Sequence, residues 1–304
     1  MIPRQPFWVG WRGLKWKILS DGNSSKPVQI NINPIDAISR WQVNSQSYGM
    51  RILSSFLLFY LCFGLFDAKA VDRFVTSEFP PYGFSENGAV SGIIPEIVEA
   101  VGRQLGHPIP VEIVPWKRAQ ALVETSEGTV AAGPLVRTCD REFRYTWLSA
   151  LPEISGDFVL LARDERLLAL ADKDFKKLRV SLIQGTAFKA DVEAAGFETI
   201  IEVETEVQSA KMLALGRTDL WASPRVVAER IYAELGHDTS DLYVATTLRN
   251  DVMFLVTSKA IDEVSLAEWR AAISKIRKDG TLNRIVSKYQ SGPIIDRLVK
   301  RPDC

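Results

Sequence analysis

Residues 71–101 read VDRFVTSEFPPYGFSENGAVSGIIPEIVEAV and combine a strand, a loop and a helix. The apolar residues of 71–77 predict a buried strand, and the two adjacent prolines and the Asn-Gly pair predict a loop over 78–92. Pro95 suits the first turn of a helix, whose apolar residues recur along one face until Gly106 ends it. This unit is typical of an α/β protein.

The alternation of strands and helices continues to residue 289. Expected strands occupy 111–114, 129–133, 158–162, 179–183, 199–203, 219–222 and 252–257. Expected helices occupy 116–124, 187–195, 207–215, 226–235, 266–278 and 282–289. A single doubly wound domain accounts for this pattern as well as two lobes do, so periodicity leaves the domain count open.

The charge balance argues against nucleic acid as a partner. Lys plus Arg and Asp plus Glu are both 37, and beyond residue 70 there are 29 basic and 34 acidic side chains. A mildly acidic protein of this kind is soluble, and it has no excess of basic residues with which to bind a polyanion.

A secretory signal is expected at residues 50–70. Met50-Arg51 precedes the uncharged run ILSSFLLFYLCFGLF at 52–66, and a small-x-small site ends at Ala70. This is the pattern of a cleaved signal peptide, with a buried helix or a retained anchor as the alternatives. Residues 1–49 would then be an extension that is disordered or that results from a mis-assigned start codon.

Cys139 and Cys304 remain after the expected cleavage, which would remove Cys62. They could form a disulfide that ties down the C-terminus, or they could be two free thiols. His107 and His237 are the two histidines, and each stands beside a glycine in a turn-like context. We therefore expect no metal site and no cofactor.

Four segments of the chain resemble a known family in order and spacing. They are TSEFPPYGFSENGAVSGIIPEIVEAV (76–101), VPWKRAQALVETSEGTVAAG (114–133), RTCDREFRYTW (137–147), and LRVSLIQGTAF (178–188) followed by LALGRTDLWASP (213–224). The chain resembles bacterial extracellular solute-binding proteins of the polar amino acid type (family 3), which are receptors of ABC importers, and it looks like a divergent member.

The resemblance implies an α/β fold of the two-lobed periplasmic binding protein type (type II), with a hinge of two crossover strands. The crossovers are expected near Gly156-Asp157 and Asn250–Val252. One lobe would comprise 71–157 plus 253–304 and the other 158–252. A ligand would be enclosed between the lobes when the hinge closes.

Arg141 and Thr186 are the expected anion-binding residues. Arg141 stands where the family's threonine-x-x-arginine motif places a guanidinium that grips the ligand's carboxylate, and its planar donors suit that task. Thr186 follows a predicted strand and precedes a predicted helix, where a hydroxyl and free backbone N–H groups could complete the carboxylate pocket. A surface ion pair for Arg141 and a simple N-cap for Thr186 are the alternatives.

Aromatic residues of the first loop are expected to form a wall for the ligand. The resemblance points to Phe79, Tyr82 and Phe84, and Trp116 opens the next predicted helix. Tyr82 and Trp116 are the preferred pair. Burial in the hydrophobic core is the competing explanation for each ring.

The sequence departs from the family where amino acid receptors place an aspartate for the ligand's α-amino group. After the turn at 216–219, Leu220-Trp221-Ala222-Ser223-Pro224 offers no carboxylate. Glu78 could replace that aspartate as the partner of a cationic group, and Trp221 could fill the vacated site with an aromatic surface. Binding of a conventional α-amino acid is therefore in doubt, and the solute stays unidentified.

The leading hypothesis is a monomeric, non-enzymatic periplasmic protein that captures a small polar, carboxylate-bearing, amino acid-like solute for the membrane permease of an ABC importer. An enzyme on the same scaffold, such as a cyclic acid dehydratase, would need a general acid in the cleft. The candidates for that acid are Glu78, Asp140, Glu153 and Asp157. A free-standing sensory binding protein is the third possibility.

Overall fold

The computed structural model describes residues 10–11, 14–15, 70–126, 128–290 and 304. The chain divides into two compact units, Met1–Phe66 and Asp67–Cys304. In the first unit the described residues form the antiparallel pair β1 (Gly10–Trp11) and β2 (Leu14–Lys15). Apart from these four residues and Ala70, the predicted extension (1–49) and signal peptide (50–70) lie outside the described residues.

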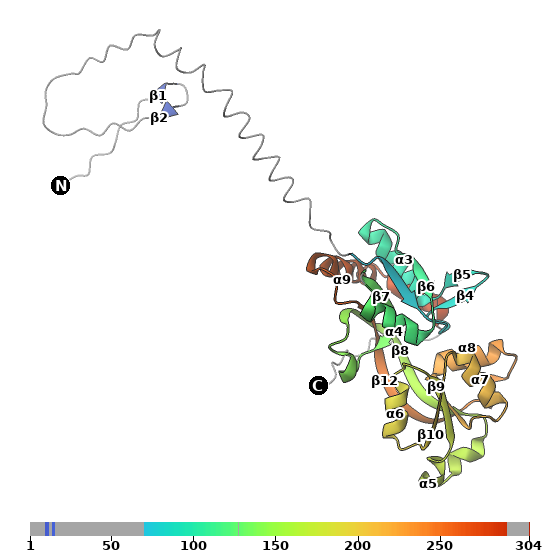
Figure 1. Cartoon of the computed structure of the whole chain (residues 1–304). Coiled ribbons are helices and arrows are strands. Elements are labelled where there is room, and N and C mark those ends of the chain that lie inside the picture. The colour runs from blue at the N-terminus through green and yellow to red at the C-terminus, as the bar shows by residue number, and fades with distance from the viewer. Residues whose placement is uncertain (1–9, 12–13, 16–69, 127, 291–303) are drawn as a thin grey trace, which may run out of the picture. The chain divides into compact units, whose positions relative to one another are not determined.

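The second unit is built on one mixed sheet (Figure 1). Eight of its described strands are hydrogen-bonded in the order β10 (Thr199–Val203), β9 (Arg179–Ile183), β11 (Leu220–Pro224), β8 (Thr146–Ala162), β12 (Tyr243–Thr257), β7 (Val130–Val136), β3 (Arg73–Thr76) and β6 (Val111–Ile113). Strands β10, β9 and β11 are parallel, as are β7, β3 and β6, whereas β8 and β12 run antiparallel to their neighbours. The predicted α/β class is confirmed.

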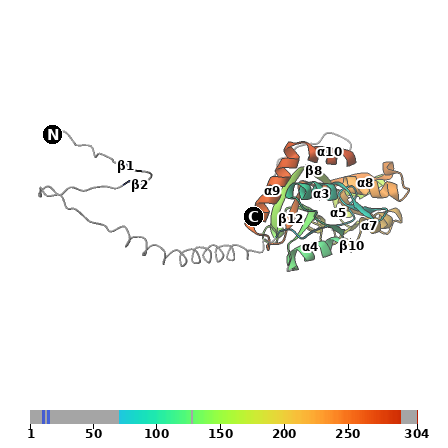
Figure 2. The ribbon, with the colours of Figure 1, turned by 90° about the horizontal axis from the view of Figure 1, so that it is seen from above.

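Helices cover both halves of this sheet (Figures 1 and 2). One half carries α3 (Ile93–Leu105), α4 (Trp116–Thr125), α9 (Glu263–Lys278) and α10 (Thr281–Tyr289), and the other half carries α5 (Asp172–Phe175), α6 (Phe188–Ala194), α7 (Glu206–Ala214) and α8 (Arg225–Glu234). Among the residues that the structure describes, none of the helices has the length and apolar character needed to cross a membrane.

The opening strand, loop and helix follow the sequence prediction closely. Helix α3 begins after Gly92 and ends at Gly106, which adopts the left-handed conformation common after a helix. Its apolar face is buried, with Ile97 and Val101 fully inaccessible to solvent. Within the predicted loop, β4 (Phe84–Glu86) and β5 (Ala89–Ser91) form a short hairpin, because Asn87-Gly88 accepts the positive φ angles of a tight turn.

The two longest strands connect the halves of the sheet. Strands β8 and β12 extend over 17 and 15 residues, much further than the apolar runs at 158–162 and 252–257 suggest. They pair with each other along their length, and the pairs Gly156–Asp251 and Asp157–Asn250 lie at the expected crossovers. The predicted two-lobed arrangement with two crossover strands agrees with this topology. The exact lobe limits, 71–157 plus 253–304 and 158–252, stay a prediction.

Cys139 and Cys304 form a disulfide. Of the two alternatives that the sequence left open, the structure therefore has the bridge, and the last residue is tied to the short 3-10 turn η1 (Cys139–Arg141). The bond therefore holds Cys304 at Cys139, which precedes Arg141 by two positions in the chain.

Candidate functional site

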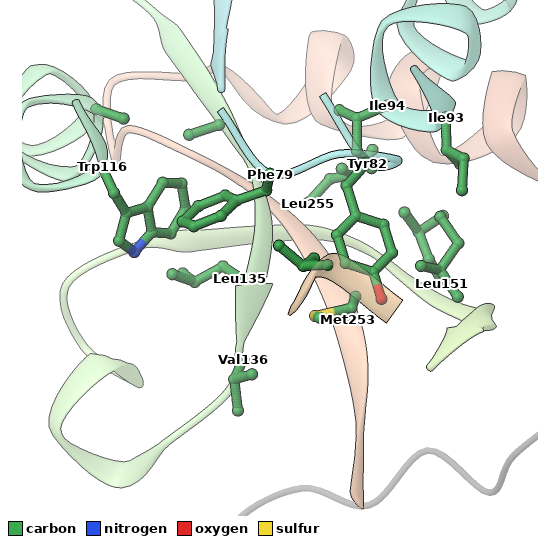
Figure 3. Packing of buried hydrophobic residues seen from close by; sticks show 14 of the residues in the cluster. Phe79, Tyr82, Ile93, Ile94, Trp116, Leu135, Val136, Leu151, Met253 and Leu255 are labelled. Atoms are coloured by element: carbon green, nitrogen blue, oxygen red, sulfur yellow. The ribbon is translucent and has the colours of Figure 1, made fainter. Parts of the chain in front are cut away.

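A small pocket brings together residues of both halves of the sheet. Its free volume is about 50 Å³. Most of its wall is apolar, and its residues are Phe79, Tyr82, Trp116, Pro134, Leu135, Val136, Arg141, Phe158, Thr186, Ala187, Phe188, Pro224 and Met253. Figure 3 shows the rings of Phe79, Tyr82 and Trp116 on one side of this region, with Leu135 and Met253 beside them. Five of the seven predicted site residues thus line one pocket, and Glu78 and Trp221 do not.

The loop after β3 positions two of the aromatic rings. The backbone N–H of Tyr82 donates to the carbonyl of Phe79 at 2.7 Å, and the carbonyl of Tyr82 accepts from Ile94 N–H at the start of α3. Gly92 packs against this turn so closely that a Cβ atom would lie 2.7 Å from the Tyr82 carbonyl oxygen, and its φ of +122° also favours glycine. The loop is therefore anchored to the helix that follows it.

The hydroxyl of Tyr82 has no hydrogen-bond partner among the described residues. The residue is 1% exposed, and its hydroxyl points toward Met253 (Figure 3). Burial, and to a smaller extent the negative charge of Asp157, raises the pKa of Tyr82 far above its ordinary value. The side chain therefore stays protonated, and it can donate to an oxygen of a bound molecule.

Trp116 and Phe79 form an edge-to-face pair with ring centroids 5.7 Å apart. Trp116 is the first residue of α4 and is 3% exposed, so the helix start fixes the indole at the wall of the pocket. On β8, Phe158 packs on Phe188 of α6 with centroids 5.1 Å apart. Phe84, the third loop aromatic, packs against Tyr289 and Arg230 and lies outside the pocket.

Arg141 is the buried cation of the pocket. It is 4% exposed, and its guanidinium donates to the carbonyl of Val136 at 3.0 Å and to that of Gly185 at 2.8 Å. Within the described part of the chain, no carboxylate lies within ion-pair distance of it. Burial lowers the pKa of Arg141, but an arginine stays charged in a protein. The surface ion pair that was its alternative explanation is not observed.

The carbonyl of Gly185 joins the two halves of the site. It accepts from Arg141 and also from the Gln120 amide of α4 at 2.8 Å. Gly185 has φ of +78°, and a Cβ atom there would lie 2.7 Å from the Gln120 amide nitrogen. Glycine is needed at this point because the backbone is left-handed and the facing helix is in contact.

Thr186 lines the pocket, but it is not the donor that the sequence suggested. Its hydroxyl and its backbone N–H both donate to the carbonyl of Ile183, at 2.7 and 3.3 Å. Helix α6 starts two residues later and has no side-chain cap, so the N-cap alternative does not apply either. What Thr186 offers a ligand is the lone pairs of its hydroxyl oxygen, which accept hydrogen bonds.

Glu78 lies at a second, outer cavity. Its carboxylate accepts from the backbone N–H of Ser85 at 3.1 and 3.3 Å, and it shares this cavity with Glu234 and Arg230. Partial burial, followed by repulsion from Glu234, raises the pKa of Glu78. The expectation that Glu78 partners a cationic group in the ligand pocket is not met, because its side chain turns back onto the hairpin that begins at Phe84.

Trp221 is a core residue and does not face the pocket. It is 0% exposed, and its indole N–H donates to Glu206 of α7 at 2.7 Å. Side chains alternate along a strand, so Trp221 lies on the face of β11 opposite to Leu220 and Ala222. Trp221 therefore does not supply the aromatic surface that the sequence suggested for the ligand site. The next strand residue to reach the pocket is Pro224, at the end of β11.

The sequence reasoning missed several residues of the pocket. Met253 and Phe158 come from the crossover strands, and Pro224 ends β11. The sequence carried a signal for Pro224, since this residue ends the segment 220–224, which has no aspartate. Gln120, which bonds to Gly185, carried no signal because a glutamine on an amphipathic helix is usually solvated. Among the described residues, no group of His, Cys, Asp or Glu is arranged to hold a metal ion.

Comparison with known proteins identifies the family. The sequence signature of the bacterial extracellular solute-binding proteins, family 3, matches residues 73–292. The chain belongs to this family. It is also 21% identical over 219 residues to the probable amino-acid-binding protein YxeM of Bacillus subtilis (strain 168), covering 70% of this chain and 81% of that protein. A solute-binding protein with a divergent sequence is therefore the assignment that the likeness supports.

Solved structures of related proteins have the same two-lobed fold. One is an ABC uptake transporter substrate-binding protein from Streptococcus pneumoniae with bound histidine, with a TM-score of 0.64, 20% identity, and coverage of 75% of this chain and 95% of that one. Another is an ancestral amino acid-binding protein, a precursor of cyclohexadienyl dehydratase, with a TM-score of 0.60, 19% identity, and coverage of 73% and 95%. At these identities the likeness establishes the fold.

Proposed function

We propose that this protein captures a small polar solute bearing a carboxylate in the periplasm and delivers it to the membrane permease of an ABC importer. The expected secretory signal at residues 50–70 and the family support export across the inner membrane. In this proposal the protein works as a monomer without catalysis, and its lobes close over the solute between the crossover strands.

The observation that carries the proposal is the buried guanidinium of Arg141. Two carbonyls use two of its five N–H donors, and in the described part of the chain no carboxylate lies within ion-pair distance of it. A buried charge without a counter-charge is costly, so a solute that brings a carboxylate stabilises the closed protein. A planar guanidinium also matches a carboxylate in geometry.

Thermal stability measured with a panel of carboxylates, amino acids, polyamines and neutral sugars tests this proposal. A carboxylate that binds the folded protein raises the melting temperature with its concentration. We expect that shift to disappear in Arg141→Met and to persist in Arg144→Met, a matched control at a more exposed arginine paired with Glu124. An equal shift in Arg141→Met would contradict the assignment of Arg141 to the site.

The dehydratase alternative is addressed by the same panel. The related ancestral structure is a precursor of such an enzyme. None of the four candidate general acids lines the pocket: Glu78 lies at the outer cavity, Glu153 is held by Arg277 at 2.5 Å, Asp157 pairs with Asn250 at 2.5 Å, and Asp140 accepts from Thr138 at 2.5 Å. Formation of a product from a cyclic carboxylate, detected by mass spectrometry, would favour the hypothesis of a dehydratase over that of a receptor.

A further inference from the structure

The geometry of the pocket points to a solute with a carboxylate, an apolar body and one hydrogen-bonding oxygen, but no ammonium group. We infer this class, for example a hydroxy acid of leucine size, from the chemistry of the pocket wall. The inference rests on the proposed function, because it takes Arg141 as the group that holds the carboxylate. It narrows the amino acid-like solutes to those without the amino group.

The wall around Arg141 is apolar where a second charge would have to be met. Pro224 at the end of β11, Met253 on β12 and Phe158 on β8 all line the pocket, and each is an apolar side chain. Phe158 and Met253 are at most 4% exposed. An ammonium group placed among these side chains would lose its water without gaining a hydrogen-bonded anion.

Two carboxylates of the neighbouring strands and helices already accept hydrogen bonds, although the charge of Asp157 still acts on Tyr82. Asp157 accepts from the Asn250 amide at 2.5 Å, and Asp191 accepts from Arg249 at 2.6 Å. Neither lines the pocket. A bound zwitterion would therefore pair its carboxylate and leave its ammonium group buried and unpaired, which strongly disfavours it.

Two groups of the wall suit a neutral oxygen. The Tyr82 hydroxyl is buried and has no partner in the described structure, so it gains a hydrogen bond from an oxygen acceptor. The Thr186 hydroxyl gives its proton to Ile183 and keeps lone pairs for a donor. A hydroxyl on the solute can accept from Tyr82 and donate to Thr186.

The size of the pocket limits the solute. A cavity needs about 10–15 Å³ to hold one water molecule, so a free volume of about 50 Å³ has room for about four. This free volume favours a small acid, and a body as large as a branched six-carbon chain or a phenyl ring enters only with displacement of side chains in the wall. Large sugars and peptides do not fit.

Isothermal titration of the protein with three matched probes tests the inference. The probes are leucine, 2-hydroxy-4-methylpentanoate and 4-methylpentanoate, with phenylalanine, 3-phenyllactate and 3-phenylpropionate as a second set. We expect the hydroxy acid to bind most tightly in at least one set, and its amino acid to bind about 100-fold more weakly or worse. Tyr82→Phe should remove the advantage of the hydroxy acid over the plain acid, an advantage of about 3- to 10-fold.

Pro224→Asp provides a gain-of-function test. Pro224 is the N-cap of α8, and aspartate is a favoured N-cap residue, so the substitution suits the local backbone. The new carboxylate would face the pocket, and we expect amino acid binding to strengthen at least tenfold while hydroxy acid binding weakens. Pro224→Asn is the control, because it has nearly the same shape without the charge, and it should give no gain for the amino acid.

The outcomes separate the two proposals. If the amino acid binds as tightly as the hydroxy acid and Arg141→Met abolishes both, the carboxylate site stands and the inference about the ammonium group is overturned. If no acid of either set binds while another carboxylate raises the melting temperature through Arg141, the proposed function stands and the inference about the solute class is overturned. A gain for the amino acid in Pro224→Asp but not in Pro224→Asn supports the inference.

Discussion

Glu206 is a buried acid whose ionisation should control how stability depends on pH. It is the first residue of α7, is 1% exposed, and accepts from the Trp221 indole through one carboxyl oxygen. Its other carboxyl oxygen has no partner among the described residues. Burial is the main cause that raises the pKa of Glu206 to about 8, and the Trp221 indole and the Ser223 hydroxyl oppose it.

The sign of the effect follows from proton binding. Between the ordinary pKa of 4.5 and about 8, the unfolded chain has lost this proton while the folded protein keeps it, so raising the pH favours unfolding. Glu206→Gln removes the titration and keeps an acceptor for Trp221. Relative to the wild type, the variant should gain stability as the pH rises, with an upper bound of about 5 kcal/mol above pH 8 and little difference near pH 4.5.

Urea unfolding of both proteins at several pH values between 4.5 and 8.5 measures this difference. Glu204→Gln is the matched control, since Glu204 is an exposed glutamate two residues away. The control should differ from the wild type by a small amount that does not grow with pH. A difference between Glu206→Gln and the wild type that stays constant from pH 4.5 to 8.5 would refute the reasoning.

Three further predictions concern the site and its surroundings. Gly185→Ala should weaken ligand binding and lower stability by about 1–2 kcal/mol, because the left-handed backbone and the contact with Gln120 exclude a Cβ atom; titration and urea unfolding check this, and unchanged values would contradict it. Reducing the bond between Cys139 and Cys304 should lower stability by about 2–4 kcal/mol, measured by unfolding with and without reductant, and Cys304→Ser should then be insensitive to reductant. Trp221→Phe should lower stability by about 1–3 kcal/mol, because Glu206 loses its donor, yet leave ligand affinity within about twofold; a large loss of affinity would return Trp221 to the site.

Much of the fold could be predicted from local pattern. The apolar spacing of 93–105 and the stop at Gly106 specify α3, since a helix that buries one face needs that periodicity. The length of β8 and β12 could not be predicted in this way. Their middle parts carry polar residues such as Asp157 and Asn250, and these form strand because each pairs with the other strand.

The candidate site likewise has features that could be predicted from the sequence and features that could not. Phe79, Tyr82, Trp116, Arg141 and Thr186 could be named from motifs, because each stands in a loop or at a helix start whose position in the fold follows from chain order. Their hydrogen bonds could not. Whether Thr186 donates to a ligand or to Ile183 depends on the shape of a single turn, and a sequence motif does not fix that shape.

The sequence by itself determined the α/β class, the family resemblance and the positions of the buried cation and the aromatic wall. Those features depend on periodicity and on short segments whose residues are neighbours in the chain. The tertiary structure decided that Glu78 and Trp221 lie away from the pocket, that Pro224, Met253 and Phe158 form its wall, and that Arg141 has no carboxylate partner in the described part of the chain. The reason is physical: burial and pairing are properties of the space around a side chain, and that space is built from residues that are distant in sequence.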